Sequence, residues 1–368
     1  MKGTDVIMNS KERVKIALKM EEPDRIPLDY WADATVSRRV MEALNLNGIE
    51  QLYRYLNIDC RFIEGTVYNG PRLQKFEDGS GMDIWGVSRK NVPVNEGDPG
   101  KGSYEHVVEH PLAGAENVKD IENYGGWPSA DWYDYSCAGD MAEEYSGFAV
   151  ICGGDRLNRT AQLKPAMYLR GVEQIMLDLY LNPGLVEAMI ERFVAFYLEY
   201  NKRIFENAAG KIDIFFMGDD FGTQNSMIMS REMWRRFLKP GFKRFIELAH
   251  RYGSKVMHHT CGSIEPLIPE FIDCGLDILQ SLQPQAAGMD FGKIKKNYGG
   301  YICFQGGIDI QNTMPYGSVE DVENEVKDRI ETLGPGGGYI LCTAHNMQAD
   351  TPVENVLALY RAAMKYGA

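Results

Sequence analysis

The stretch Lys255-Val-Met-His258-His259-Thr260-Cys261-Gly262 joins a short apolar run to an imidazole and a thiol two residues apart. Residues i and i+2 of a strand point to the same side. His259 and Cys261 are therefore predicted to enter one site together. We expect Lys255–His259 to be a buried strand, and the polar residues at its end to lie where parallel strands present functional side chains.

Seven further β-rich apolar runs recur between helical patterns. Several are nearly continuous in apolar residues, which is typical of parallel strands buried on both faces. Eight strands alternating with helices predict an α/β fold of the (β/α)8 TIM-barrel type. Such barrels can carry 368 residues as one domain, so we expect a single domain over 1–368. The other seven runs are Ile26–Trp31, Cys60–Gly65, Phe148–Gly153, Ile212–Gly218, Asp277–Leu282, Tyr301–Gln305 and Gly338–Cys342.

One segment, about 68–146, breaks this alternation. It is rich in Gly, Pro, Trp, Tyr and Asp and is far longer than an ordinary connection between a strand and a helix. We expect a long insertion after the second strand, near the barrel mouth. Its aromatic residues suit a lid or a partner surface, or alternatively a small core of their own. They include Tyr68, Trp85, Trp127, Trp132, Tyr133 and Tyr135.

Helix boundaries can also be predicted. Thr351-Pro352-Val353-Glu354 predicts an N-cap hydroxyl, an early proline and a capping box for a last helix that ends before Gly367. Ser10 is predicted to cap the first helix, and Ser318 with Asp321 to begin a later one.

Composition limits the classes of function. A formal charge of −13 argues against a nucleic-acid-binding surface and against docking on anionic membranes. No apolar run is long enough to span a bilayer, and the first residues lack the apolar core of a signal peptide. We therefore expect a cytoplasmic protein. Seven scattered cysteines are an odd number, which favours free thiols over a disulfide framework.

Polar residues gather where the predicted strands end. Asp219 and Asp220 are consecutive, so on an extended segment one should point into the site. We expect it to act as an acid, a base or a positioning group. The alternative for either aspartate is an N-cap for the segment after Gly222. The candidates for substrate binding are Gln224, Gln283, Asp309 and Asn346.

His259 and Cys261 offer half of a zinc centre, because imidazole and thiolate are donors that zinc prefers. A catalytic site needs a third protein ligand. The candidates are His345, Cys342 and one of the two aspartates, and His345 is favoured because it lies beyond a strand end, where loop residues can turn inward. The alternative is a core histidine beside a buried thiol that packs as a small hydrophobic residue.

These segments resemble the uroporphyrinogen decarboxylase superfamily. The resemblance spans nearly the whole chain, is strongest from about Gly218 onward, and implies a (β/α)8 barrel. Its motifs here are Arg25-Ile26-Pro27, Gly218-Asp-Asp-Phe-Gly-Thr-Gln224, His259-Thr-Cys261-Gly262, Gly306-Gly-Ile-Asp309, and Gly338-Tyr-Ile-Leu-Cys-Thr-Ala-His345-Asn followed by Asp350-Thr-Pro-Val-Glu354-Asn355.

Two activities are known in that superfamily: metal-free decarboxylation of uroporphyrinogen, and zinc-dependent methyl transfer to or from a corrinoid protein. The decarboxylase branch holds substrate carboxylates with an Arg-Gln-Ala-Gly-Arg motif after its first strand. This chain has Leu28–Asp33 there, with two acidic residues that would repel a polyanion. The methyltransferase branch carries His-x-Cys-Gly, which His259 and Cys261 match. His345 stands where many of its members have a late cysteine, and the decarboxylase branch also has a histidine there.

The resemblance implies a methyltransferase in which zinc is held by His259, Cys261 and His345, with Cys342 as the alternative third ligand. The methyl group would move between a small substrate, either a methoxylated compound or a thiol, and a corrinoid carried by a partner protein. Two alternatives remain, a metal-free lyase of the decarboxylase type and a non-catalytic barrel that binds a tetrapyrrole or a protein. The direction of transfer stays open, as does the choice between a monomer and a homodimer.

Overall fold

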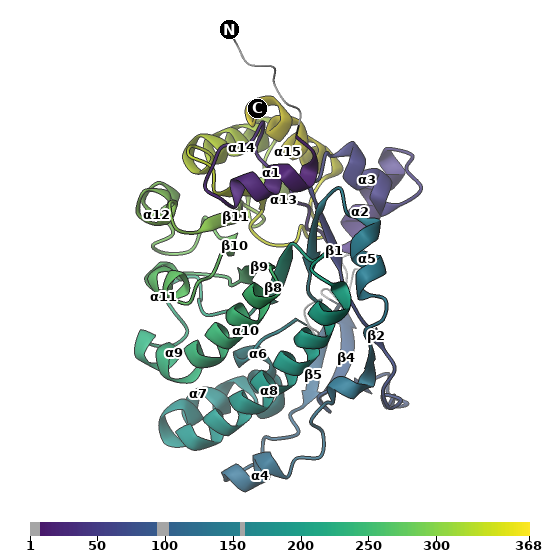
Figure 1. Cartoon of the computed structure of the whole chain (residues 1–368), viewed down its shortest axis with the longest axis vertical. Helices are drawn as coiled ribbons and strands as arrows, with labels where there is room; N and C mark the ends of the chain where they lie inside the picture. Colours follow the sequence, from purple (N-terminus) through teal and green to yellow (C-terminus); the bar gives the residue numbers. More distant parts are fainter. Residues whose placement is uncertain (1–7, 94–102, 155–158) are drawn as a thin grey trace.

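A curved parallel sheet of seven strands organises the chain (Figure 1). The computed structural model describes residues 8–93, 103–154 and 159–368. Neighbouring strands follow the order of the sequence, and every pair is parallel. The strands are β1 (Cys60–Ile63), β7 (Ala149–Cys152), β8 (Ile214–Gly218), β9 (Lys255–His259), β10 (Ile278–Leu282), β11 (Cys303–Ile308) and β12 (Tyr339–Thr343).

The predicted first strand, Ile26–Trp31, is not a regular strand. Leu28 forms an isolated parallel bridge with Leu341 of β12, and its carbonyl accepts a hydrogen bond from the backbone N–H of Asp59, just before β1. The Leu28 N–H turns instead to the Asp59 carboxylate at 2.8 Å. Pro27 has no N–H to donate to a ladder, which is one reason why this strand does not extend. The segment nevertheless lies between the two edge strands of the sheet.

The other seven predicted runs each overlap a strand, and two of these strands extend past the predicted carboxyl end, β12 by the single residue Thr343. The prediction ended the seventh run at Gln305, whereas β11 continues to Ile308. Gly306 and Gly307 lie inside β11 with φ values of 116° and 96°, which side chains rarely adopt. A Cβ on Gly306 would lie 3.1 Å from the backbone nitrogen of Leu282 on the neighbouring strand, so β11 approaches β10 closely here.

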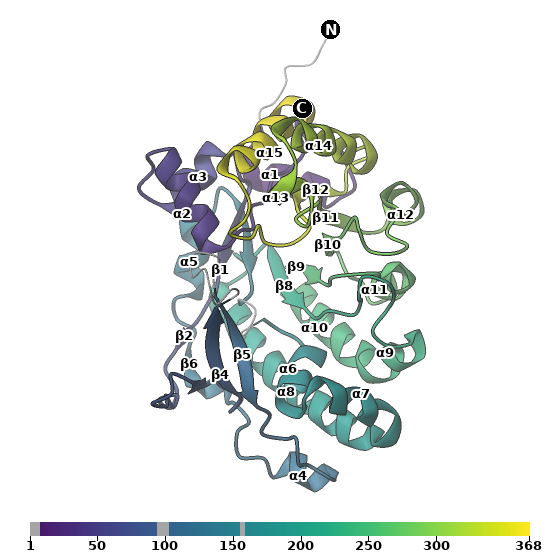
Figure 2. The ribbon, with the colours of Figure 1, turned by 180° about the vertical axis from the view of Figure 1, so that it is seen from behind.

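Helices follow most strands and cover the convex side of the sheet (Figures 1 and 2). Within the described ranges, each helix is too short or too polar to cross a bilayer. The helices that pack around the sheet are α1 (Ser10–Ala17), α2 (Ala34–Ala43), α3 (Ile49–Tyr55), α6 (Leu163–Arg170), α7 (Val172–Leu181), α8 (Pro183–Ala208), α9 (Arg231–Phe237), α10 (Lys239–Arg251), α11 (Ile268–Asp273), α12 (Phe291–Tyr298), α13 (Thr313–Tyr316), α14 (Val319–Leu333) and α15 (Val353–Tyr366), with a 3-10 turn at Glu265–Leu267.

The inside of the curve holds a small apolar core of its own. Each strand contributes at least one inward residue, as the twofold alternation of a strand requires. Val14 of α1 belongs to the same core, so α1 packs against the amino-terminal ends of the strands and leaves their carboxyl ends for the site. The strand residues of this core are Cys60, Ala149, Ile151, Ile214, Phe216, Met257, Ile278, Cys303 and Ile340.

Two of the three predicted helix caps are wrong. Asn9 caps α1, since its side chain accepts from the Glu12 N–H and Glu12 reaches back, so Ser10 is already the first helical residue. For α15 the N-cap is Pro352, and no side-chain cap is present. The prediction from Thr351 placed the cap one residue early. Ser318 and Asp321 form the predicted capping box of α14.

The described residues of the segment 67–144, which are 67–93 and 103–144, form two small sheets and two short helices beside α8 (Figure 2). Trp85 is almost completely buried, and its ring lies 5.2 Å from that of Phe193 and 5.1 Å from that of Phe196 on α8. Trp127 packs on the same group. These aromatic residues therefore make a satellite core. The elements are β2 (Val67–Tyr68), β3 (Gly81–Met82), β4 (Ser88–Pro93), β5 (Ser103–Glu109), α4 (Val118–Glu122), a 3-10 turn (Ala130–Trp132), β6 (Tyr133–Asp134) and α5 (Ala138–Glu144).

Candidate metal and substrate site

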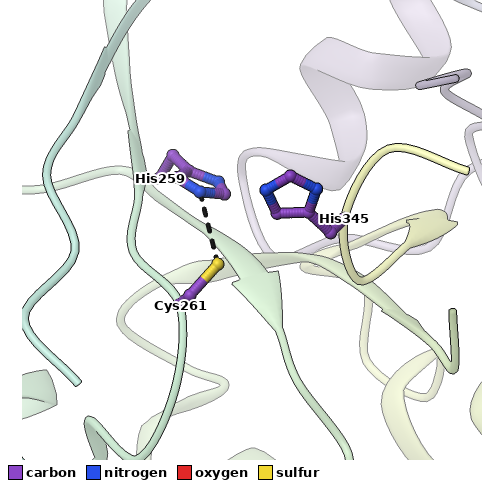
Figure 3. Close-up of side chains that lie close together, drawn as sticks. All are labelled: His259, Cys261 and His345. Carbon is purple, nitrogen blue, oxygen red and sulfur yellow. Dashed lines mark hydrogen bonds between the residues drawn. The ribbon is translucent and has the colours of Figure 1, made fainter. Parts of the chain in front are cut away.

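Three potential metal ligands meet at the carboxyl end of the sheet (Figure 3). His259 is the last residue of β9, Cys261 follows two residues later, and His345 lies two residues beyond β12. Their ligand atoms all lie within 4.8 Å of one another, and Cys261 Sγ is 3.4 Å from His259 Nε2. This spacing fits one ion bound by all three groups.

The neighbouring strand orients His259. Gln280 of β10 is in register with His259, and its Oε1 is hydrogen-bonded to His259 Nδ1. An amide oxygen can only accept, so Nδ1 carries the proton and Nε2 keeps its lone pair toward Cys261. Ligating histidines are commonly held by such a bond on the other ring nitrogen.

An aromatic residue from the irregular first segment supports both imidazoles. The Trp31 ring stacks on His345, with centroids 4.7 Å apart and planes 27° apart, and meets His259 edge-on at 5.2 Å. The two histidine rings are 5.4 Å apart. Trp31 therefore limits the positions that either imidazole can take.

The protonation states suit a metal better than a free nucleophile. Burial lowers the pKa of His259 far below its usual value and also lowers the pKa of His345, so both imidazoles are neutral at neutral pH. Burial, with a contribution from the Asp220 charge, raises the pKa of the Cys261 thiol to about 12. A cation bound between these groups would supply the positive charge that a thiolate needs here. The donor set, its spacing and its burial therefore fit zinc.

The Asp220 side chain faces this cluster. Its Oδ1 lies 3.5 Å from His259 Nε2 and accepts the backbone N–H of Cys261 at 3.1 Å. Its Oδ2 pairs with the ammonium group of Lys164. The positive charge of His259 when protonated and that of Lys164 outweigh burial and hold the pKa of Asp220 well below its usual value. The carboxylate is therefore ionised and fixed beside the cluster.

Asp219 points the other way and caps a helix. Its carboxylate accepts the backbone N–H groups of Gln162, Leu163 and Lys164 at 2.5, 2.8 and 2.7 Å. These groups belong to the first turn of α6, so the prediction of a cap for the segment after Gly222 named the wrong helix. Burial raises the pKa of Asp219 to about 6. The two carboxylates point in opposite directions because consecutive residues of an extended segment face opposite sides.

Cys342 lies outside the cluster. It is fully buried on β12, and its Sγ is 4.0 Å from the hydroxyl oxygen of Thr343. Among the described residues, the group of possible metal ligands holds His345 and not Cys342.

The predicted substrate-binding residues fall into two sets. Gln283 Nε2 donates to Gln224 Oε1 at 2.9 Å while Gln283 Oε1 accepts from the Gly262 N–H, so these glutamines tie the loop after β9 to that after β10. The Asp309 carboxylate accepts backbone N–H groups of its own loop ahead of α13. Asn346 lines the main cavity beside His345.

That cavity has a volume of about 810 Å³ and opens above the cluster. One wall carries His259, His345 and Asp220, and another carries Trp85, Arg89 and Tyr104 from the segment between β1 and β7. The size falls in the range of small-molecule sites.

Sequence reasoning missed three residues that shape this site. Gln280 is a polar residue inside the apolar run Ile278–Leu282, and that anomaly was a usable signal. Trp31 lies in a segment that was predicted as a strand, with no indication that its ring supports the imidazoles. Nothing in the sequence indicated a role for Lys164, because only the fold brings its side chain to Asp220.

Comparison with known proteins places the chain among enzymes with related sequences. It is 26% identical over 236 residues to the methylated-thiol–coenzyme M methyltransferase of Methanosarcina mazei, covering 61% of this chain and 60% of that protein. It is 27% identical over 139 residues to the methylcobamide:CoM methyltransferase MtaA of Methanosarcina barkeri, covering 38% of each. A uroporphyrinogen decarboxylase of Coxiella burnetii is 25% identical over 149 residues, or 38% of this chain and 40% of that one. The alignments thus span less than two thirds of these relatives.

A solved structure of a methyltransferase from Methanosarcina mazei has the same fold. It superposes with a TM-score of 0.66 at 18% identity and covers 98% of this chain and 99% of that one. The sequence profile of the family described as uroporphyrinogen decarboxylase (URO-D) matches residues 160–366, more than half of the 368 residues. The chain belongs to the uroporphyrinogen decarboxylase family.

Proposed function

We propose that this protein is a zinc-dependent methyltransferase that moves a methyl group between a small substrate and a corrinoid carried by a partner protein. The observation that carries the proposal is the convergence of His259, Cys261 and His345 within 4.8 Å. A metal-free decarboxylase has no need of a thiol beside two neutral imidazoles. Two methyltransferases among the family relatives add support.

His259, Cys261 and His345 would hold the zinc ion, and His259 and His345 line the main cavity from which a substrate would approach. When bound, zinc would act as a Lewis acid that stabilises negative charge on a substrate heteroatom, either the oxygen that a methyl group leaves or a sulfur that accepts one. Gln280 keeps Nε2 of His259 unprotonated and aimed at the cluster. Trp31 holds His345 in its rotamer by stacking.

Asp220 and Lys164 would position the substrate. The ammonium group of Lys164 keeps the carboxylate ionised, and the backbone N–H of Cys261 fixes one of its oxygens. A polar group of a bound molecule can then be oriented by Asp220 at a constant angle to the cluster. Asn346 lies on the same cavity wall and is a second candidate for this role, while Gln224, Gln283 and Asp309 would shape the loops around it.

We further propose that the architecture is a (β/α)8 barrel over a single domain, 1–368, in which the segment around Leu28 is the reduced first strand. The segment 68–146 would be an insertion near the mouth that contributes to the surface on which the corrinoid protein docks. A cytoplasmic location is part of the proposal, because all seven cysteines are free thiols, as is usual in a reducing compartment.

Metal analysis tests the proposal. Protein purified without added zinc is expected to contain equimolar zinc, and Cys261→Ser is expected to lose it. Cys342→Ala is the matched control and should keep the metal, because that thiol lies outside the cluster. Cobalt-substituted protein should show a thiolate charge-transfer absorption that disappears in Cys261→Ser only. A wild-type protein without stoichiometric metal would contradict the proposal and favour a metal-free lyase.

A further inference from the structure

A second cavity, of about 360 Å³, adjoins the main cavity at Trp31 and Arg159 and runs into the inside of the curved sheet. We call it the aromatic recess. Its walls carry five aromatic rings, those of Tyr30, Trp31, Tyr53, Phe62 and Phe216. A cavity of this size is typical of small-molecule sites.

Phe62 shows that the recess is open to a ligand. It lies on β1 and faces Phe216 of β8 across the recess, with ring centroids 5.8 Å apart. Phe62 is 41% exposed, although its neighbours Arg61 and Ile63 are buried. An inward strand position normally packs against other side chains. Here the ring faces empty space that a flat molecule could fill.

The recess also has a polar floor and a charged rim. Asp29 is 2% exposed, and its carboxylate accepts the Tyr30 N–H at 2.8 Å and a hydrogen bond from Gln305. Burial raises the pKa of Asp29 to about 7, so a fraction of the carboxyl groups can donate a hydrogen bond near neutral pH. The Arg159 guanidinium lies over the Phe216 ring at 4.3 Å, where the recess meets the main cavity.

Two residues connect the recess to the metal cluster. Trp31 lines the recess and stacks on His345, while Gln280 lines the recess and bonds to His259. Trp31 and Arg159 also line the main cavity, whose wall carries His259 and His345. A molecule held in the recess can therefore extend one edge into the main cavity, toward the cluster. Aromatic side chains attract a planar ring by stacking and edge contacts, which an aliphatic chain cannot reproduce.

We propose that the recess binds a single aromatic ring, and that the substrate is an aryl methyl ether whose methoxy oxygen points toward His259, Cys261 and His345. This inference rests on the proposed function and decides between the two substrate classes left open by the sequence. In the transfer, the bond between the methyl carbon and the aryl oxygen breaks and its electron pair stays on the oxygen. The methyl carbon bonds to Co(I) of the corrinoid, which supplies the new pair.

Binding measurements test this without requiring turnover. Titration calorimetry with 2-methoxyphenol and its saturated counterpart 2-methoxycyclohexanol compares two probes that differ mainly in the ring. The phenol is expected to bind at least about tenfold more tightly, and Phe62→Ala is expected to remove about tenfold of its affinity. Phe76→Ala is the matched control, because Phe76 is 45% exposed but lies outside the recess. It should bind like the wild type.

The outcomes separate this inference from the proposed function. Equal affinity for the two probes, no binding of either, or an unchanged affinity in Phe62→Ala would overturn the aromatic recess even in a zinc-containing protein. Ring-selective binding that depends on Phe62, in protein that proves to contain no zinc, would support the recess and overturn the metal-dependent reaction alone.

Discussion

Replacing Asp29 by asparagine should make the folded protein less sensitive to rising pH. The Asp29 carboxyl is buried inside the sheet, where one oxygen accepts the Tyr30 N–H and the other a hydrogen bond from Gln305. Asparagine has nearly the same shape and no charge. Gln305 Oε1 has no hydrogen-bond partner among the described residues, so a flipped Gln305 amide can accept from the new side-chain NH2 group.

The size of the effect follows from the pKa of Asp29. Burial raises it from 3.8 to about 7, whereas the unfolded chain keeps the lower value. The folded state therefore binds more protons than the unfolded state between these two values, and its stability falls as pH rises through that window. Each pKa unit corresponds to about 1.4 kcal/mol, so the penalty grows by about 3 kcal/mol between about pH 5 and pH 8 and is constant above that.

Urea denaturation of the wild type and of Asp29→Asn at a series of pH values measures this difference. The free energy of unfolding of the variant, minus that of the wild type, should rise by about 2 to 3 kcal/mol from about pH 5 to pH 8. The difference in free energy of unfolding at a single pH also includes the effect of changed packing. The change of this difference with pH is therefore the quantity that tests the reasoning. Parallel pH curves for the two proteins would refute the reasoning, because the carboxyl would then ionise as it does in the unfolded chain.

Two further substitutions test the support of the site. Asp219→Ala removes the acceptor for three backbone N–H groups at the start of α6 and should lower the free energy of unfolding by about 2 kcal/mol. Urea denaturation measures this loss, and Asp219→Asn should recover part of the lost stability. Gln280→Leu removes the acceptor that orients His259 and should weaken zinc binding by about 10- to 100-fold, measured by competition with a chelator. Gln280→Glu keeps an acceptor, so its zinc affinity should stay close to that of the wild type. Equal zinc affinities for the wild type and both variants would exclude the positioning role of Gln280.

The strands could be predicted because their signal is local. A short, nearly continuous apolar run between turn residues is typical of a buried strand, and seven of the eight predicted runs overlap one. The exception, Ile26–Trp31, depends on a distant side chain: the Asp59 carboxylate takes the N–H of Leu28 that a regular ladder would use. Two of the predicted N-cap residues were wrong for a related reason. Asn9 and Ser10 are both good capping residues, and only the backbone conformation decides between them.

The site could be predicted only in part. Spacing along one strand brought His259 and Cys261 together, and the choice of His345 rested on its place beyond a strand end. The structure brings these three side chains into one cluster. Lys164 and Trp31 had to come from the fold, because each lies far along the chain from its partner. The aromatic recess is also beyond sequence reasoning, since Phe62 looks like any other apolar residue of a buried strand.

The curvature of the sheet is what makes the cluster possible. β9 and β12 are separated by β10 and β11, so three steps of about 4.8 Å would put their ends about 14 Å apart in a flat sheet. The ligand atoms of His259 and His345 nevertheless lie within 4.8 Å. The difference must come from the bending of the sheet and from the placement of His345 beyond the strand end, where Trp31 stacks on it. Trp31 itself belongs to the segment that joins β12 to β1. A metal ion bound at the cluster would therefore bind the curved form alone, and its binding energy would stabilise the approach of the end of β9 to the loop that follows β12.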